Sequence, residues 1–218
     1  MKKLIVIRHG ESYKNLKNID GGKGTTLTEQ GKTQVLKKCE LLISNSVVDD
    51  NSIMYVSTDR IQILETASII QKELSISKVC KSKLYSPIDL GVLDGMPKDR
   101  QKQLYPEAIE KLEQWNEGLC DINEFKVEGL QDAEEYYLQL KEFIENLEDN
   151  RSYVLVGTRS DISALKNVVL GNNPKEKMKY KYYPTDYAEG FIVEMDEKNK
   201  FKIIESIQES KENDINER

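Results

Sequence analysis

The stretch Leu4-Ile5-Val6-Ile7-Arg8-His9-Gly10-Glu11-Ser12 decides the fold. Four consecutive aliphatic residues, three of them β-branched, predict a strand buried on both faces, as in a parallel sheet. Tyr153–Val156 has the same character, and Met54–Val56 is a weaker candidate. The first strand runs directly into an arginine, a histidine and a glycine, which places chemically capable side chains at its carboxyl end.

Between these strands lie segments with apolar residues at helical spacing, and they cover residues 28–45, 60–74, 131–148 and 161–170. Gly190–Glu194 and Phe201–Glu205 are predicted to form a closing hairpin. Strands that alternate with helices indicate an α/β domain with a mainly parallel sheet. We expect one domain over residues 1–208, an irregular insertion at about residues 83–130 over the carboxyl ends of the strands, and a polar, disordered tail at residues 209–218.

Composition limits the classes of partner. The chain has 218 residues, 32% of them charged, and a net charge of −6, which argues against nucleic acid or an anionic membrane as a partner. Four apolar residues near the amino end are too few for a signal peptide or a membrane span, and three scattered cysteines suit a reducing, cytoplasmic setting. The single histidine, His9, excludes a multi-histidine metal site.

Arginine is scarce, with six residues among 32 basic ones, and two of the six follow buried strands. Arg8 follows the first strand, and Arg159 stands two residues after Gly157 at the end of the later one. Ligands of open α/β sheets bind beyond the carboxyl ends of the strands, and a guanidinium there suits phosphate or carboxylate. The alternative is structural, with each arginine paired to a carboxylate and His9 held by a hydrogen bond.

The motif Arg8-His9-Gly10-Glu11-Ser12, with Asn15 beyond it, resembles the signature of the histidine phosphatase superfamily, which includes the cofactor-dependent phosphoglycerate mutases. Further segments resemble the family in the same order along the chain: Leu27–Gly31, Ser57–Ala67, Leu90–Gly95, Tyr105-Pro106 and Val154–Leu165. The resemblance covers most of residues 3–206. It implies the phosphoglycerate mutase-like fold. Neither a metal nor a cofactor is expected.

The resemblance also implies roles for particular residues. His9 occupies the position of the nucleophile, which attacks a phosphomonoester and becomes a phosphohistidine, and Arg8 assists it. Arg8, Asn15, Gln62 and Arg159 are the expected phosphate-binding residues. The expected ligand is a small phosphorylated molecule, or a phosphate or sulfate anion. A protein partner remains open, and the sequence does not indicate an oligomeric state.

Three positions depart from the family pattern. Gln62 stands where the second arginine belongs, Pro87 where the acidic residue belongs, and Arg159 where the second histidine belongs. On a continuous helix, Arg60 would lie roughly 200° from Gln62 and so face away from the pocket. Candidate replacement acids are Asp161, Asp94, Glu11 and Asp89, although Asp161 also fits the N-cap of the following helix.

Two functions therefore remain open. The first is a phosphate-ester-binding protein whose hydrolytic power is lost or much reduced, and which serves as a sensor, a regulator or a partner-binding module. The second is an active phosphomonoesterase that uses His9 as nucleophile together with a non-standard general acid. The phosphoglycerate mutase reaction itself is not expected, because it requires control of proton transfer in both directions.

Overall fold

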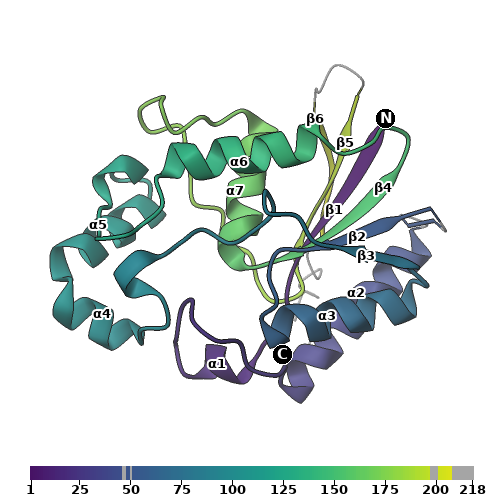
Figure 1. The fold of residues 1–218 in the computed structure, drawn as a ribbon, viewed down its shortest axis with the longest axis horizontal. Helices are drawn as coiled ribbons and strands as arrows, with labels where there is room; N and C mark the ends of the chain where they lie inside the picture. Colours follow the sequence, from purple (N-terminus) through teal and green to yellow (C-terminus); the bar gives the residue numbers. More distant parts are fainter. Residues whose placement is uncertain (46–47, 50, 197–200, 208–218) are drawn as a thin grey trace, which may run out of the picture.

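The computed structural model describes residues 1–45, 48–49, 51–196 and 201–207. The tail expected at residues 209–218 and the turn of the predicted closing hairpin lie outside these residues. Figure 1 shows the chain as one sheet flanked by helices, with a group of short helices set to one side.

The sheet has six strands in the order β3-β2-β4-β1-β5-β6. Its strands are β1 (Lys2–Arg8), β2 (Ile53–Val56), β3 (Lys78–Cys80), β4 (Ser152–Gly157), β5 (Gly190–Met195) and β6 (Phe201–Ile207). The first four are parallel, β5 is antiparallel to β1, and β6 is antiparallel to β5. The predicted α/β class with a mainly parallel sheet is confirmed, and the predicted hairpin corresponds to β5 and β6.

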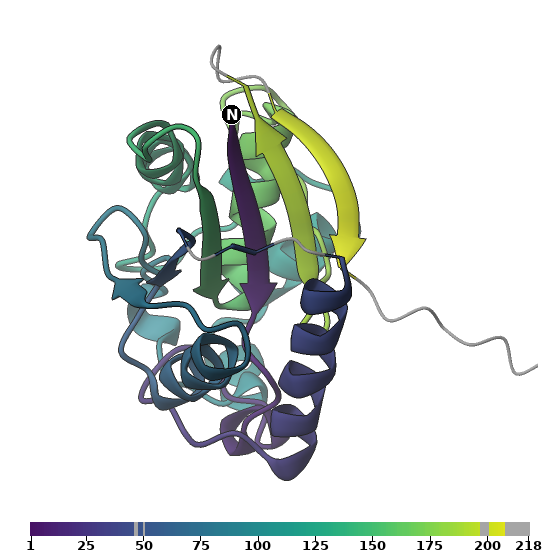
Figure 2. The same ribbon diagram turned by 90° about the vertical axis from the view of Figure 1, so that its right-hand side faces the viewer.

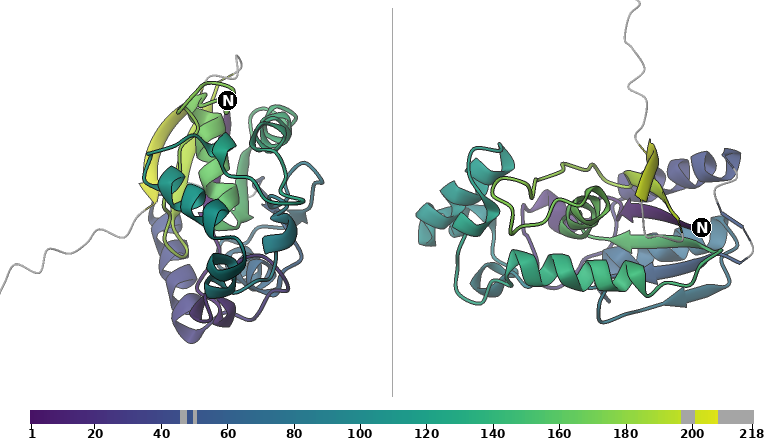
Figure 3. Two further views of the ribbon diagram at one scale, coloured as in Figure 1. Left: turned by 90° about the vertical axis from the view of Figure 1, so that its left-hand side faces the viewer. Right: turned by 90° about the horizontal axis from the view of Figure 1, so that it is seen from above.

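Alternation along β1 assigns the flanking helices to two faces. Leu4 and Val6 pack in a core with α6 (Ala133–Glu145) and α7 (Arg159–Leu170), whereas Ile5 and Ile7 pack in a second core with α2 (Glu29–Ser44) and α3 (Ile61–Glu73). Figure 2 shows α7 behind the strands, and the right panel of Figure 3 shows α2 and α6 on opposite sides of the sheet. Burial on both faces explains why the strand sequence is continuously apolar.

Two glycines let α2 approach the end of β1 closely. A Cβ on Gly10 would lie 2.5 Å from the carbonyl oxygen of Gly31, and one on Gly31 would lie 2.1 Å from the carbonyl oxygen of Glu11. Both distances are shorter than a side chain can tolerate. Thr28 caps α2 by accepting a hydrogen bond from the Gly31 N–H at 2.9 Å. The glycine pair therefore sets the position of the loop that carries His9.

The segment over residues 83–130, called the insertion below, is more regular than its prolines and glycines predicted. It contains η1 (Gly91–Leu93), α4 (Lys98–Leu104), α5 (Pro106–Asn116) and η2 (Ile122–Glu124). Pro106 is the first residue of α5, where its missing N–H costs nothing. Leu93, Ile109 and Phe125 form a small core of their own. In the right panel of Figure 3 these helices lie beyond one end of the sheet.

Hydrogen bonds at several places attach the insertion to the body of the protein. On one side, Gly95 N–H donates to the Asp20 carbonyl at 2.9 Å, and Gly22 N–H donates to the Asp94 carboxylate at 2.8 Å. On the other side, Met178 N–H donates to the Asp121 carboxylate at 2.7 Å. The space between these attachments opens onto the carboxyl ends of β1 and β4.

Candidate active site

The site lies where the parallel strands β1 and β4 end side by side. Arg8 and Gly157 are register partners, and His9 N–H donates to the Gly157 carbonyl at 3.1 Å. The residues that follow both strands therefore meet at one edge of the sheet. A cavity of about 330 Å³ opens there, and Arg8, His9 and Arg159 all line it. The structure brings these three predicted residues together in one pocket.

His9 is buried, with 4% of its surface exposed, and its ring orientation is fixed by its neighbour. Nδ1 lies 2.7 Å from the Gly10 carbonyl oxygen, so this nitrogen carries the hydrogen and Nε2 keeps its lone pair. Burial is the main cause that lowers the pKa of His9 to about 3; the hydrogen bond to Gly10 opposes this shift, and the nearby charges of Arg8, Lys14 and Arg60 contribute to it. The imidazole is neutral at neutral pH, which a nucleophile requires.

Arg8 supplies a buried positive charge beside this imidazole. Nη1 donates to the Thr185 carbonyl at 2.5 Å, and the guanidinium carbon lies 4.0 Å above the centre of the Tyr187 ring. The buried Nε has no hydrogen-bond partner among the residues that the structure describes. Burial lowers the pKa of Arg8, and the charge of Arg159 acts in the same direction. An anion in the pocket would relieve both costs.

The other predicted phosphate-binding residues also line the pocket. The Asn15 amide oxygen accepts from the N–H and the hydroxyl of Ser12, at 3.0 and 2.7 Å. Gln62 is buried, and its amide oxygen accepts from Thr25 N–H at 3.2 Å. Arg159 is more exposed, and its Nη2 lies 3.6 Å from a carboxylate oxygen of Asp20. Asn15 and Gln62 therefore also hold the loops that shape the pocket.

The expectation that Arg60 faces away from the pocket is wrong. Arg60 lines it, and its charge contributes to the lowered pKa of His9. The cause is the start of α3, which begins at Ile61 and leaves Arg60 as its extended N-cap residue, with φ −61° and ψ 136°. The angular spacing of a helix does not apply to a residue before its first turn. Arg60 is thus a third arginine in the pocket, besides Arg8 and Arg159, and it lies two positions before Gln62 in the chain.

Lys14 is a pocket residue that sequence reasoning missed. It belongs to the short helix α1 (Tyr13–Leu16), is 6% exposed, and donates from Nζ to the Gly21 carbonyl at 2.6 Å. Burial lowers its pKa, and the charge of Arg60 adds to that effect. Lys14 is one of 26 lysines, and no local pattern marks it, because its burial depends on the turn at Gly21-Gly22 folding back over it. This turn has positive φ at both glycines.

None of the four candidate acids is among the described residues that line the pocket. The Glu11 carboxylate accepts from the Thr28 hydroxyl, Asp94 accepts from Gly22 N–H, and Asp89 accepts from Gly91 N–H. Each serves a turn or a helix start. A role for any of them as proton donor stays a prediction.

Asp161 is fully buried and serves the start of α7. It accepts from the Tyr136 hydroxyl at 2.7 Å and from Thr158 N–H at 2.6 Å, and burial raises its pKa. The N-cap prediction for Asp161 is corrected by three positions, because α7 begins at Arg159 and Thr158 is its N-cap. Asp161 is the third residue of the helix and completes a capping box.

Two other carboxylates, Asp20 and Asp132, do line the pocket. Asp20 lies between Arg159 and Lys98, at 3.6 and 4.0 Å. Asp132 caps α6 by accepting from the backbone N–H groups of Glu134 and Glu135. Pro87, at the position of the family's acid, also lines the pocket. No group of three or more metal-ligand side chains gathers in the described part of the chain.

Fold and site together define a class of protein. It is an α/β protein with a neutral, oriented histidine at the end of a central strand, surrounded by cations in a pocket of ligand size. The sequence pattern of the histidine phosphatase superfamily (branch 1) matches residues 4–204. The chain belongs to this superfamily.

One similar protein by sequence is a 2,3-bisphosphoglycerate-dependent phosphoglycerate mutase of Bartonella henselae, 33% identical over 106 residues. The match covers 48% of this chain and about half, 50%, of that protein. Among solved structures, Bacillus stearothermophilus YhfR is 20% identical, with a TM-score of 0.71 over 93% of this chain and 95% of that one.

A mycobacterial glucosyl-3-phosphoglycerate phosphatase, solved in complex with VO3, is 18% identical, with a TM-score of 0.72 over 94% of this chain and 98% of that one. These structural likenesses establish the fold. None of the helices described here is long and apolar enough to cross a membrane.

Proposed function

We propose that this protein binds a phosphate monoester in the pocket around His9 and has lost most of the power to hydrolyse it. The observation that carries the proposal is the neutral, buried imidazole among four cationic side chains: Arg8, Lys14, Arg60 and Arg159. Phosphoryl recognition depends on positioning and on neutralising the charge of the phosphate oxygens. The pocket supplies both.

The loss of hydrolysis follows from the residues around the leaving oxygen. Pro87 cannot donate a proton, and Arg159, at the position of the second histidine, stays charged at working pH. The two carboxylates among the described residues that line the pocket are already engaged. Asp20 faces the cation of Arg159, and Asp132 accepts from backbone N–H groups. A missing general acid typically costs about 10²–10⁴-fold in rate. The cost is greatest for alkyl esters, whose leaving alkoxide needs protonation.

The second candidate, an active phosphomonoesterase, is supported by Arg60 in the pocket and by the lone pair on His9 Nε2. In that reaction the lone pair attacks phosphorus, and the ester oxygen departs with the electron pair of its broken bond. Water then attacks the phosphohistidine. The imidazole is released neutral, and dihydrogen phosphate carries away both hydrogens of the water.

Hydrolysis of 4-nitrophenyl phosphate and of glycerol 3-phosphate separates the two candidates. We expect slow or no turnover of the aryl ester and none of the alkyl ester, while inorganic phosphate binds in calorimetry and binds much less in Arg8→Ala. Turnover of both esters that vanishes in His9→Ala would overturn the first candidate. Absence of phosphate binding would overturn both.

A gain-of-function variant tests the missing acid directly. Pro87→Glu is expected to make turnover of the alkyl ester measurable, because proton donation supplies about 10²-fold in rate. Pro106→Glu is the matched control, because Pro106 is exposed at the first position of α5, away from the described pocket wall. The three free cysteines support a reducing, cytoplasmic setting for this function.

A further inference from the structure

The pocket is larger than its cationic end requires. Its volume of about 330 Å³ falls in the range of sites for small organic ligands, which begins at about 300 Å³. The cations gather at the ends of β1 and β4 and at the start of α3. The opposite wall is formed by the insertion. The two ends of the pocket therefore present different chemistry to one ligand.

The insertion wall is largely apolar. Six of its pocket-lining residues are Leu90, Leu93, Leu112, Ile122, Phe125 and Leu130. All six also belong to the insertion's small core or pack against it. Each of these side chains thus faces the pocket on one side and packs against the insertion's small core on the other.

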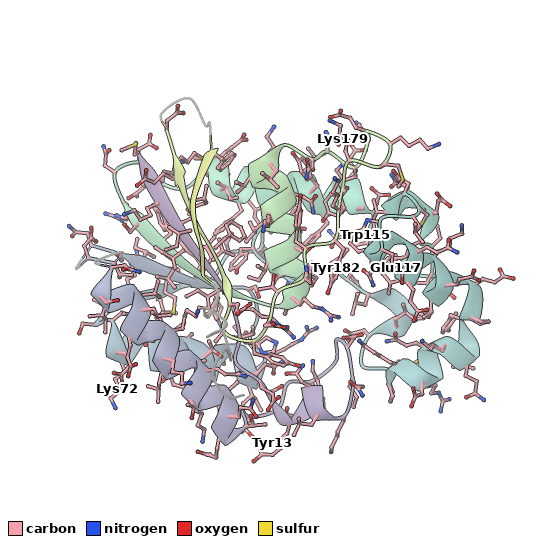
Figure 4. All side chains as sticks on the ribbon, turned by 180° about the vertical axis from the view of Figure 1, so that it is seen from behind. Tyr13, Lys72, Trp115, Glu117, Lys179 and Tyr182 are labelled. Carbon is pink, nitrogen blue, oxygen red and sulfur yellow. The ribbon has the colours of Figure 1, made fainter. Side chains whose placement is uncertain are left out.

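A cluster of three aromatic side chains joins the insertion wall to the cationic end of the pocket: Trp115, Tyr180 and Tyr182. Trp115 Nε1 donates to the Tyr180 carbonyl at 3.0 Å, and its ring lies 6.0 Å from that of Tyr180, nearly parallel to it. The Tyr182 ring meets Trp115 edge to face at 5.7 Å, and Figure 4 shows the two side by side. Trp115, Tyr180 and Tyr182 all line the same pocket as Arg8.

Polar side chains of the insertion wall are largely engaged within the protein. Gln101 donates to the Met96 carbonyl at 3.0 Å, and Asn123 donates to the Pro174 carbonyl at 2.9 Å. Gln131, the residue that follows the insertion, donates to Gln139 at 3.1 Å. These amides hold the insertion in place. Their amide N–H groups are thus used within the protein and are not available to donate to the hydroxyl groups of a sugar.

The lysines of this wall also face carboxylates. Lys126 lies 3.8 Å from Asp132, and Lys98 lies 4.0 Å from Asp20. A second phosphate on the ligand would have to compete with these carboxylates for the two lysines. The wall therefore favours an uncharged organic group.

We propose that the insertion wall, with Trp115 and Tyr182, binds an apolar, ring-sized organic group of a phosphate monoester whose phosphate lies at Arg8 and His9. This inference rests on the proposed phosphate site. Sugar phosphates and bisphosphates bind more weakly than an aryl or arylmethyl phosphate. Burial of one aromatic ring is expected to tighten binding by about 10- to 100-fold.

Phosphonates test this preference without any turnover. The probes are inorganic phosphate, methylphosphonate, benzylphosphonate, 1-naphthylmethylphosphonate and glucose 6-phosphate, each titrated by calorimetry into the full chain. We expect affinity to rise from methyl to benzyl to naphthylmethyl, with glucose 6-phosphate below benzylphosphonate. Equal affinity for the methyl and benzyl probes, or tightest binding of glucose 6-phosphate, would overturn the inference. If no anion binds at all, the phosphate site itself fails, and the inference fails with it.

Variants locate the preference in the wall. Tyr182→Ala and Leu112→Ala are expected to reduce the ratio of benzyl to methyl affinity by about 3- to 10-fold. Tyr182→Phe should restore it, because the ring remains. Tyr13→Ala, an exposed residue off the described pocket wall, is the control and should leave the ratio unchanged. A loss of affinity that is equal for both probes in Tyr182→Ala would assign Tyr182 a purely structural role and contradict the proposal.

Discussion

The floor and the wall of the pocket are built in opposite ways. The floor consists of residues that directly follow β1 and β4, which are hydrogen-bonded neighbours, so its charged groups are placed by strand register. The wall comes from the insertion, whose helices reach the body through contacts such as Trp115 with Tyr180, 65 residues apart. The floor is polar and positively charged, whereas the wall is largely apolar. Recognition of the phosphate is thus set locally, and recognition of the organic group over long range.

The largest expected effect concerns the charge state of the floor. The pKa of His9 is about 3 when folded, compared with about 6.5 when unfolded. Between these values the unfolded chain takes up a proton that the folded chain refuses, so stability falls as the pH decreases through that window. The loss reaches about 5 kcal/mol at most. Denaturant unfolding from pH 7 to pH 3 measures it.

The variant His9→Asn isolates this contribution from that of the carboxylates, because asparagine does not titrate. Its stability should fall less steeply between pH 6.5 and pH 3 than that of the wild type. Parallel pH profiles for the two proteins would show that His9 titrates normally.

The second prediction concerns the packing beneath the floor. Gly31→Ala should lower the free energy of unfolding by about 1–3 kcal/mol, because the new methyl group meets the backbone of Glu11. Thermal and urea unfolding measure the change. Thr33→Ala, on the exposed face of the same helix, is the control and should change stability far less. A Gly31→Ala protein as stable as the control would mean that α2 is free to move away.

The third prediction concerns a residue that spans floor and wall. Arg60 lies 3.5 Å from the carboxylate of Asp94 in the insertion and also lines the pocket. Arg60→Gln should weaken phosphate binding by about 10-fold, which corresponds to about 1.4 kcal/mol. Arg100→Gln, in α4 and off the described pocket wall, is the comparison. Equal phosphate affinity in the two variants would remove Arg60 from the anion site.

The smallest expected effect concerns the ion pair at the pocket edge. Asp20 faces both Arg159 and Lys98, so its carboxylate competes with a bound phosphate. Asp20→Asn should tighten phosphate binding by about 2- to 5-fold, in line with the modest worth of exposed ion pairs. The gain should shrink as salt concentration rises. Weaker binding in Asp20→Asn would show that Asp20 positions Arg159 instead of competing for it.

The sequence predicts the floor because its determinants are local. The run Leu4–Ile7 is apolar on both faces, and Arg8 and His9 follow it without a gap, so a strand and its terminal residues could be located together. The short strand β3 was not predicted, because Lys78–Cys80 has one apolar valine and is largely exposed. Helical spacing gives the wrong direction for Arg60, because α3 begins one residue after it, at Ile61.

The wall could not be predicted for a different reason. Tyr180 and Tyr182 alternate with lysines in the sequence, and this local pattern does not indicate which distant side chains they contact. Their pocket role depends on Trp115, which no spacing rule links to them. Contacts between distant segments follow from the packed fold, and a single sequence carries no direct signal for them.

The glycine contact below the floor has a mechanical consequence. The carbonyl of Gly10 orients the imidazole of His9, while Gly10 itself rests on Gly31 of α2 and donates its N–H to Thr66 of α3 at 3.2 Å. The backbone of Gly31 and the side chain of Val35, both in α2, pack directly against Gly10. A displacement of α2 or α3 would therefore shift the backbone of Gly10 and rotate the imidazole of His9. The orientation of the His9 ring thus depends on how α2 and α3 pack against the backbone of Gly10.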